Sequence, residues 1–233
     1  MFSRSARLYD AIYHWKDYPA EAASLHELIQ ARRPGAATLL DVACGTGAHL
    51  AELARWYSCV GVDLDRELLA IARERLPAEV DLYQTDMRAF DLGRGFDAVI
   101  CMFSSVGYVG DRTQLERAVA SMARHLEPGG VLVVEPWLSP DRIEVPHVGA
   151  VFVDEPELKI ARINTVEVDG RRSILELNYL VGRPDRVEHF TETHELTLFE
   201  VDETLEAFRA AGLEVEHDPE AGPMGRGLYV AKG

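Results

Sequence analysis

The chain has 233 residues, and 47% of them are hydrophobic, so it is long enough to form one α/β domain with a substantial core. Its 39 acidic residues outnumber its 24 basic residues, which gives a formal net charge of -15 at pH 7. A surface this negative repels phosphate backbones and anionic lipids, so we expect neither nucleic acid nor a membrane as a partner.

The three cysteines indicate a reducing compartment. Cys44, Cys59 and Cys101 are odd in number, lie in apolar stretches and form no Cys-x-x-Cys or Cys/His cluster. We therefore expect buried thiols, with neither a disulfide nor a metal site. Residues 1–10 lack the apolar stretch of a signal peptide, and no apolar run is long enough to span a bilayer. These features predict a cytoplasmic protein.

Strand-like apolar runs alternate with helical stretches over the first 137 residues. A helix is predicted from Pro19 to the Pro34-Gly35 stop, and the strands are predicted at 38–43, 59–64, 80–83, 96–102 and 131–135. Asp65 and Asp111 are expected to cap two of the intervening helices, the second of which reaches Leu126 and ends at Pro128-Gly129-Gly130. An earlier helix carries apolar positions from Leu50 to Tyr57. This order predicts an α/β fold, a Rossmann-like parallel sheet with helices on both faces.

The period changes to two between residues 145 and 199. Segments 159–168, 172–181 and 187–198 alternate apolar and polar residues, and Asp169-Gly170 is a strong hairpin signal. We expect an antiparallel β insertion set into or beside the parallel sheet. A helix at 204–211, closed by Gly212, and a last strand at 227–231 follow.

A glycine-rich turn follows the first predicted strand, in Leu39-Leu40-Asp41-Val42-Ala43-Cys44-Gly45-Thr46-Gly47. Glycines let the backbone turn sharply and let a ligand approach beyond the carboxyl end of the strand. A dinucleotide site needs a third glycine at position 50, where this chain has Leu50, and Asp41 would repel a phosphate. An NAD-dependent oxidoreductase is therefore disfavoured, whereas a ligand with a cationic amino group suits Asp41.

Further acids follow the next strands in order. Asp63 and Leu64 end the second strand, where a carboxylate accepts hydrogen bonds from both ribose hydroxyls. Asp86 and Met87 follow the third strand and offer adenine an acceptor and an apolar surface. Met102 follows the fourth strand. The set of strand, loop, acid and acid predicts a cofactor site made of Asp41, Ala43, Gly45, Gly47, Asp63, Leu64, Asp86, Met87 and Met102.

This set resembles the class I methyltransferases, in which these positions hold S-adenosylmethionine. A closer resemblance, to the 3-amino-sugar N,N-dimethyltransferases that act on dTDP-linked deoxysugars, runs from about Leu8 to the C-terminus. It is carried by Leu8-Tyr9-Asp10, Lys16-Asp17-Tyr18, Met102-Phe103-Ser104-Ser105-Val106-Gly107-Tyr108, Val134-Glu135-Pro136-Trp137 and Gly225-Arg226-Gly227-Leu228, together with the glycine loop. The chain lacks a glycine-containing insertion that these enzymes have before Lys16, and it has Phe2 where they have a tyrosine that reaches the acceptor.

The resemblance implies roles for individual residues. Tyr9 and Tyr18 would contact the amino-acid end of the cofactor, and Tyr108 would be the catalytic residue beside the acceptor amine. Arg226 would bind the diphosphate of the sugar nucleotide, as its planar guanidinium favours. The remaining acceptor-side residues would be Ser104, Ser105, Glu135 and Trp137. His189 and His194 lie in the alternating region, where each is more typical of a surface or hairpin residue.

The expected activity is in-line methyl transfer to an amine, with catalysis mainly by positioning. Three alternatives stay open at this stage: another small-molecule amine, hydroxyl or carboxylate as acceptor, a non-catalytic cofactor-binding protein, and a homodimer in place of a monomer. We expect a single methyltransferase domain over 1–233. Its parts are an N-terminal helical cap (1–37), a cofactor-binding core (38–137), an antiparallel segment on the acceptor side (138–200) and a C-terminal helix and strand (201–233).

Overall fold

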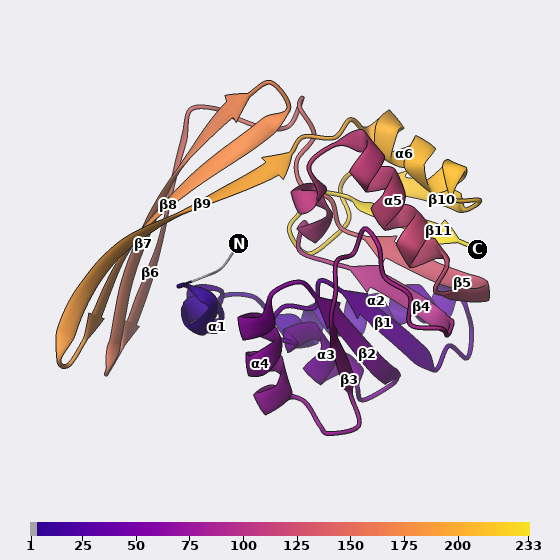
Figure 1. The fold of residues 1–233 in the computed structure, drawn as a ribbon, viewed down its shortest axis with the longest axis horizontal. Coiled ribbons are helices and arrows are strands. Elements are labelled where there is room, and N and C mark those ends of the chain that lie inside the picture. The colour runs from indigo at the N-terminus through magenta and orange to yellow at the C-terminus, as the bar shows by residue number, and fades with distance from the viewer. Residues whose placement is uncertain (1–3) are drawn as a thin grey trace.

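The computed structural model describes residues 4–233, so Phe2 lies outside the described part. Two sheets form the molecule (Figure 1): a seven-stranded sheet in the order β10-β11-β5-β4-β1-β2-β3 and a four-stranded sheet in the order β6-β7-β8-β9. The strands are β1 (Thr38–Val42), β2 (Ser58–Asp63), β3 (Asp81–Gln84), β4 (Phe96–Cys101), β5 (Leu126–Val134), β6 (His147–Glu155), β7 (Leu158–Asp169), β8 (Arg172–Arg183), β9 (Arg186–Thr197), β10 (Glu214–Asp218) and β11 (Leu228–Lys232). The helices are η1 (Ala6–Leu8), α1 (Tyr9–Ile12), α2 (Tyr18–Arg32), α3 (Ala48–Leu53), α4 (Arg66–Arg75), η2 (Ser105–Val109), α5 (Arg112–Ala123) and α6 (Val201–Ala210).

The larger sheet is parallel from β3 to β5 and gains an antiparallel edge from β11 and β10. The expected Rossmann-like sheet with an antiparallel β insertion is therefore confirmed. In the sheet, β1 lies between β2 and β4, so the order of the strands along the chain reverses at the boundary between β1 and β4. Ligands bind beyond the carboxyl ends of strands at such a reversal.

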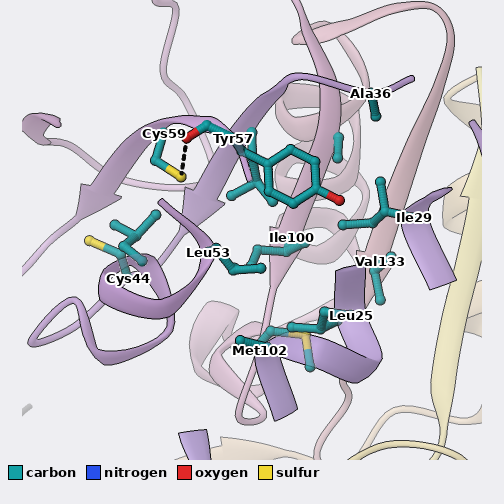
Figure 2. Packing of buried hydrophobic residues seen from close by; sticks show 14 of the residues in the cluster. Leu25, Ile29, Ala36, Cys44, Leu53, Tyr57, Cys59, Ile100, Met102 and Val133 are labelled. Atoms are coloured by element: carbon teal, nitrogen blue, oxygen red, sulfur yellow. Dashed lines mark hydrogen bonds between the residues drawn. The ribbon is translucent and has the colours of Figure 1, made fainter. Parts of the chain in front are cut away.

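Helices cover both faces of this sheet, so its inner strands are buried on both sides. On one face, Leu25 and Ile29 of α2 and Leu53 of α3 pack against Ile100 and Val133 of the sheet (Figure 2). The opposite face is covered by α5 and α6 and forms a second apolar cluster. All three cysteines are buried and unpaired, as expected. No helix among residues 4–233 is long and apolar enough to cross a membrane.

Several predicted boundaries hold and others do not. Asp65 and Asp111 cap α4 and α5, as expected. The helix predicted to reach Leu126 ends at Ala123, and the expected stop at residues 128–130 lies inside β5. The physical reason is that Gly129 and Gly130 exchange backbone hydrogen bonds with Gly233, at a place where the register between β4 and β5 shifts.

Other differences concern short elements. The helix expected to run to Tyr57 ends at Leu53, and residues 54–56 form turns that bring the Tyr57 ring into the core. The sequence reading did not identify η1, α1, η2, β6 or β10, because short or polar segments carry little periodic signal. Among the described residues, the predicted strands of the alternating region are found as β7, β8 and β9, and the hairpin at Asp169-Gly170 joins the first two.

The four-stranded sheet stands apart from the larger one and curves beside it (Figure 1). Leu8 and Ile12, at the N-terminal end of the described chain, pack in one apolar cluster with Tyr179 of β8 and Phe190 of β9. The N-terminal segment therefore covers part of one face of this sheet.

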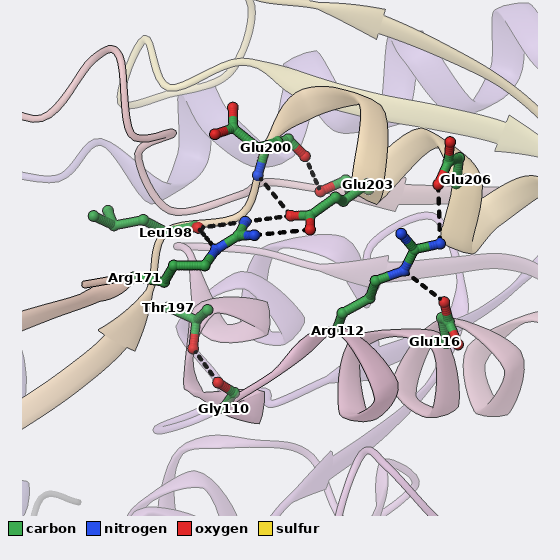
Figure 3. A network of polar contacts seen from close by, with 10 residues as sticks. Gly110, Arg112, Glu116, Arg171, Thr197, Leu198, Glu200, Glu203 and Glu206 are labelled. Atoms are coloured by element: carbon green, nitrogen blue, oxygen red, sulfur yellow. Dashed lines mark hydrogen bonds and ion pairs between the residues drawn. The ribbon is translucent and has the colours of Figure 1, made fainter.

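A polar network fixes the point where β9 leaves the four-stranded sheet and enters α6 (Figure 3). Arg171, in the turn between β7 and β8, donates to the carbonyl of Leu198 and pairs with Glu203 of α6. Thr197 Oγ1 donates to the carbonyl of Gly110 at 2.8 Å. This bond holds the end of β9 against η2, the helix that carries Tyr108.

Candidate functional site

The glycine loop after β1 adopts a left-handed backbone at three positions. Ala43, Gly45 and Gly47 have φ values of 61°, 57° and 72°. A Cβ on Gly47 would lie 2.8 Å from Leu76 Cδ1, so this glycine lets α3 approach α4 closely. A left-handed alanine is strained, and strain of this kind is concentrated at ligand sites.

Two buried aspartates lie below the loop. Asp63 Oδ2 accepts from the backbone N–H of Gly45 at 2.8 Å, and its Oδ1 accepts from Asp65 N–H at 2.7 Å. Burial raises the pKa of Asp63, while these two donors oppose that effect. Asp41 is 2% exposed, and its Oδ2 has no hydrogen-bond partner among the described residues. Burial raises the pKa of Asp41, and the Asp63 carboxylate adds to the effect, so a cationic ligand here would relieve an unpaired charge.

One small cavity lies between the ends of β2 and β3 and has a volume of about 140 Å³. Its walls include the predicted residues Ala43, Asp63, Leu64, Asp86 and Met87. Both oxygens of Asp86 accept from the Arg88 guanidinium, and this pairing holds the pKa of Asp86 below its usual range. Leu68, Val109 and Met87 give the cavity an apolar lining suited to a nucleobase.

A second cavity, of about 40 Å³, lies on the other side of the loop. Its walls include the predicted residues Tyr9, Tyr18, Asp41, Gly45 and Met102. Ala43 and Ser105 line both cavities, so the two adjoin.

A charged cluster that the sequence reading did not identify borders this second cavity. Lys16 has a fully buried side chain, and its Nζ lies 2.8 Å from Glu21 Oε1. The other Glu21 oxygen is 2.8 Å from His49 Nε2, and His49 lines the cavity. The pKa of Glu21 is lowered because these two contacts outweigh its burial. The cluster fixes α2 beside the glycine loop.

The turn after β4 has two consecutive residues in the left-handed region, Phe103 (φ 54°) and Ser104 (φ 64°). The Ser104 hydroxyl donates to the carbonyl of Pro136 at 2.6 Å and accepts from Arg226 Nη1 at 2.8 Å. The Arg226 guanidinium also lies 4.4 Å from the centre of the Trp137 ring. These contacts hold Arg226 in one orientation at the edge of a large cavity.

Glu135 joins the two loops that form this edge. It is fully buried, and its carboxylate oxygens accept from the backbone N–H groups of Phe103 at 2.8 Å and Met224 at 3.2 Å. Burial raises its pKa. The structure therefore gives Glu135 a supporting position under the loops, and its predicted contact with an acceptor stays a prediction.

The large cavity has a volume of about 440 Å³ and lies between the two sheets. Its walls include Tyr9, Ser104, Ser105, Tyr108, Trp137 and Arg226, all predicted at the site, together with Arg142, Arg162, Asn164 and His194, which were not. Tyr108 and Ser105 also line the cavity at the ends of β2 and β3, so the large cavity opens onto it. Among the predicted residues, Gly47 and Glu135 line none of these three cavities as the described residues form them.

Tyr108 and His194 meet where the cavities join. The Tyr108 hydroxyl lies 2.8 Å from His194 Nδ1. Tyr108 is 37% exposed at the cavity wall, and the desolvation of its hydroxyl by the surrounding protein raises its pKa. His194 is 2% exposed, and burial lowers its pKa to about 4. The signal that could have identified His194 is its place in β9, where Phe190, Glu192 and Leu196 share its buried face.

Comparisons with known proteins agree with this geometry. Residues 39–130 match the family model described as a methyltransferase domain. The chain is 45% identical to dTDP-3-amino-3,4,6-trideoxy-alpha-D-glucopyranose N,N-dimethyltransferase from Streptomyces venezuelae, over 97% of this chain and 96% of that protein.

Solved structures give the same result. The crystal structure of Streptomyces venezuelae DesVI has a TM-score of 0.93 and 45% identity and covers 97% of both chains. The S-adenosylmethionine-bound CalS10, an amino pentose methyltransferase from Micromonospora echinaspora, has a TM-score of 0.89 and 43% identity and covers 97% of this chain and 96% of its own. The chain therefore belongs to the family of S-adenosylmethionine-dependent sugar N,N-dimethyltransferases, and its cofactor is S-adenosylmethionine.

Proposed function

We propose that this enzyme methylates the amino group of a dTDP-linked amino-deoxysugar and adds two methyl groups in succession. The observation that carries the proposal is the charge of the large cavity. The chain has a net charge of -15, yet three arginines line this cavity: Arg142, Arg162 and Arg226. Among the described residues that line it, Glu144 is the one acidic residue. A cavity of this charge attracts a diphosphate, and an arginine fork binds phosphate oxygens in pairs.

Arg162 strengthens the argument because it is a buried cation that lacks an anionic partner. It is 9% exposed, and no carboxylate lies within 4.0 Å of it among the described residues. Its Nη1 lies 3.2 Å from the Tyr13 hydroxyl, and its Nε has no partner in the described chain. Burying an unpaired charge is costly, so a bound anion would stabilise this arrangement.

The cofactor residues fit a sulfonium nucleoside. We propose that Asp63 holds the ribose, that Leu64, Asp86 and Met87 hold the adenine, and that Tyr9, Tyr18 and Asp41 surround the amino-acid end. When bound, S-adenosylmethionine supplies an electrophilic methyl group that is already activated by a positively charged sulfur. The protein therefore has to exclude water and position the amine, and Tyr108 is placed for this where the cavities meet.

We also propose how the chain divides these tasks. Residues 38–137 form the cofactor-binding core, 138–200 form the acceptor side, residues 1–37 cap the site, and 201–233 complete the larger sheet. The buried, unpaired cysteines support a cytoplasmic location.

We propose that two copies of the chain form a homodimer through the outer face of the four-stranded sheet. Val148, Phe152, Ile163 and Leu180 are 47–68% exposed there, which is unusual for four large apolar side chains on one sheet. A second copy would bury them by pairing the same face with itself. Light scattering should give twice the chain mass, and a Phe152→Glu variant should run as a monomer.

Mass spectrometry of reactions with a panel of acceptors tests the activity. The panel contains dTDP-3-amino and dTDP-4-amino deoxysugars and, as matched controls, the same aminosugars without the nucleoside diphosphate. We expect a mass gain of two methyl groups on a dTDP-linked sugar and little reaction with the free sugar. Equal turnover of the free aminosugar would instead identify an enzyme for other small amines.

A further inference from the structure

The direction of the hydrogen bond between Tyr108 and His194 depends on which nitrogen of His194 carries the proton. His194 Nε2 faces Glu192 Oε2 at 3.9 Å, whereas Nδ1 faces the Tyr108 hydroxyl. At 3.9 Å the contact with Glu192 is electrostatic and not a hydrogen bond, and the Glu192 carboxylate accepts from Arg4 N, Ser5 N and Ser5 Oγ. A neutral imidazole is stabilised with its proton on the nitrogen nearer a negative charge. The charge of Glu192 therefore favours the tautomer with the proton of His194 on Nε2, in which Nδ1 is an acceptor.

In this tautomer the Tyr108 hydroxyl donates its proton to Nδ1 of His194 in the cavity wall. The phenol oxygen then presents lone pairs to the space where the large cavity meets the cofactor cavity. Among residues 4–233, the charged and titratable groups around His194 include Glu192 on its own strand, Arg162 on β7 and Tyr108 on η2. Phe190, Glu192 and Leu196 lie on the same buried face of β9 as His194.

We propose that His194 is a positioning residue that makes Tyr108 a pure hydrogen-bond acceptor for the N–H of the substrate amine, and that this contact retains the monomethylated intermediate for a second transfer. The inference rests on the proposed function. A donated N–H leaves the nitrogen lone pair directed elsewhere, whereas a hydroxyl that donated to nitrogen would occupy the lone pair that must attack.

The number of N–H groups explains why transfer would stop after two methyl groups. A neutral primary amine has two N–H groups, and the monomethylated amine still has one to donate to Tyr108. Each transfer breaks the bond between sulfur and the methyl carbon, forms the N–C bond and leaves an ammonium, which loses its extra proton to solvent in the large cavity. After the second transfer and this proton loss the dimethylated amine has no N–H, so it loses the contact with Tyr108 and leaves. A hydrogen-bond acceptor at this position thus retains the monomethylated product and releases the dimethylated one.

Two variants test the inference. His194→Leu removes the acceptor, and His194→Asn places an amide oxygen near the position of Nδ1 and serves as the matched control. We expect His194→Leu to lower kcat for the purified monomethylated substrate by ~10-fold or more, with a smaller effect on the primary amine, because a lost hydrogen bond is not compensated. The monomethylated product should accumulate with His194→Leu, and His194→Asn should restore dimethylation.

Two results would overturn the proposal: an unchanged ratio of monomethylated to dimethylated product in His194→Leu, or equal losses at both steps in both variants. If the native enzyme methylates no dTDP-aminosugar, it is the proposed function that fails. The inference is then decided by ¹⁵N NMR of the imidazole, which should show the Nε2–H tautomer and a shift of Nδ1 in Tyr108→Phe. The opposite tautomer would rule the inference out.

Discussion

Asp63 Oδ2 and the backbone N–H of Gly45 are 2.8 Å apart, so the acid at the end of β2 fixes the glycine loop that follows β1. The same carboxylate is the proposed ribose ligand, and it therefore has two tasks. We expect Asp63→Ala to raise the dissociation constant for S-adenosylmethionine by ~10-fold or more, because both the loop and the ribose lose an acceptor. Calorimetry measures this, and Asp111→Ala, which removes the cap of α5 away from these cavities, should bind the cofactor normally.

Arg226 should contribute to acceptor binding and not to cofactor binding. Arg226→Ala removes the guanidinium beside Ser104 and Trp137, and we expect the KM for a dTDP-aminosugar to rise by ~10-fold or more. Cofactor affinity should change less than about 2-fold. Arg112→Ala is the matched control, since that arginine pairs with Glu116 and Glu206 on the surface (Figure 3). A KM unchanged in Arg226→Ala would contradict the diphosphate assignment.

Tyr108→Phe removes one hydroxyl at the junction of the cavities. We expect kcat to fall by ~10-fold or more, because the ring remains while the contact with the amine is lost. Steady-state kinetics with a dTDP-aminosugar measures the effect. If turnover and acceptor affinity both remain at the native level, Tyr108 does not orient the amine.

Asp41 should make the cofactor-free protein less stable as the pH rises. Its folded pKa is raised by burial, so the stability is greatest below the unfolded pKa and falls as the pH rises toward the folded pKa. Asp41→Asn removes this loss. We expect Tm at pH 7 without cofactor to rise by roughly 2–6 °C, with a smaller difference near pH 4, while cofactor affinity falls. Scanning fluorimetry at several pH values measures it.

Asp97 provides a control of opposite sign for that experiment. Burial raises its pKa, but hydrogen bonds from Ala37, Thr38 and Arg33 outweigh this and bring the value to about 2. Its contribution to stability is therefore present above the unfolded pKa and is lost as the pH falls toward 2. Asp97→Asn should lower Tm at pH 7. The same sign for both variants would refute the electrostatic explanation.

Gly61→Ala should destabilise the larger sheet. A Cβ there would lie 2.7 Å from Leu50 Cδ1 and Leu82 Cδ2 and 2.8 Å from Cys44 Sγ. Overpacking of this kind costs about 1–3 kcal/mol, which corresponds to a fall in Tm of roughly 2–12 °C. Gly170→Ser, in an exposed turn with open space around it, measures how far a glycine substitution alone lowers Tm.

The cofactor end of the site could be predicted because its residues follow consecutive strands. Asp41, Asp63 and Asp86 are close together for the topological reason that parallel strands end at one edge. The acceptor end could not be predicted in the same way. Arg162 and His194 come from β7 and β9, which lie on either side of β8. Only the pairing of both strands with β8 and the packing of β9 against η2 bring the two residues to the cavity that Tyr108 lines.

The residues at which helices and strands end also could not be predicted from the sequence. Gly129 and Gly130 are typical of a helix stop, but hydrogen bonds to Gly233, more than a hundred residues later, draw them into a strand. Local propensity cannot report a partner that distant.

The large cavity takes its walls from both sheets, whereas the residues proposed to hold the nucleoside come from one sheet and the segment that covers it. Exchanging side chains on the inward positions of β7 and β9 would therefore reshape what the enzyme accepts and leave its methyl donor unchanged. Hairpins of this kind offer a route for redirecting the catalyst to new amines, one inward position at a time.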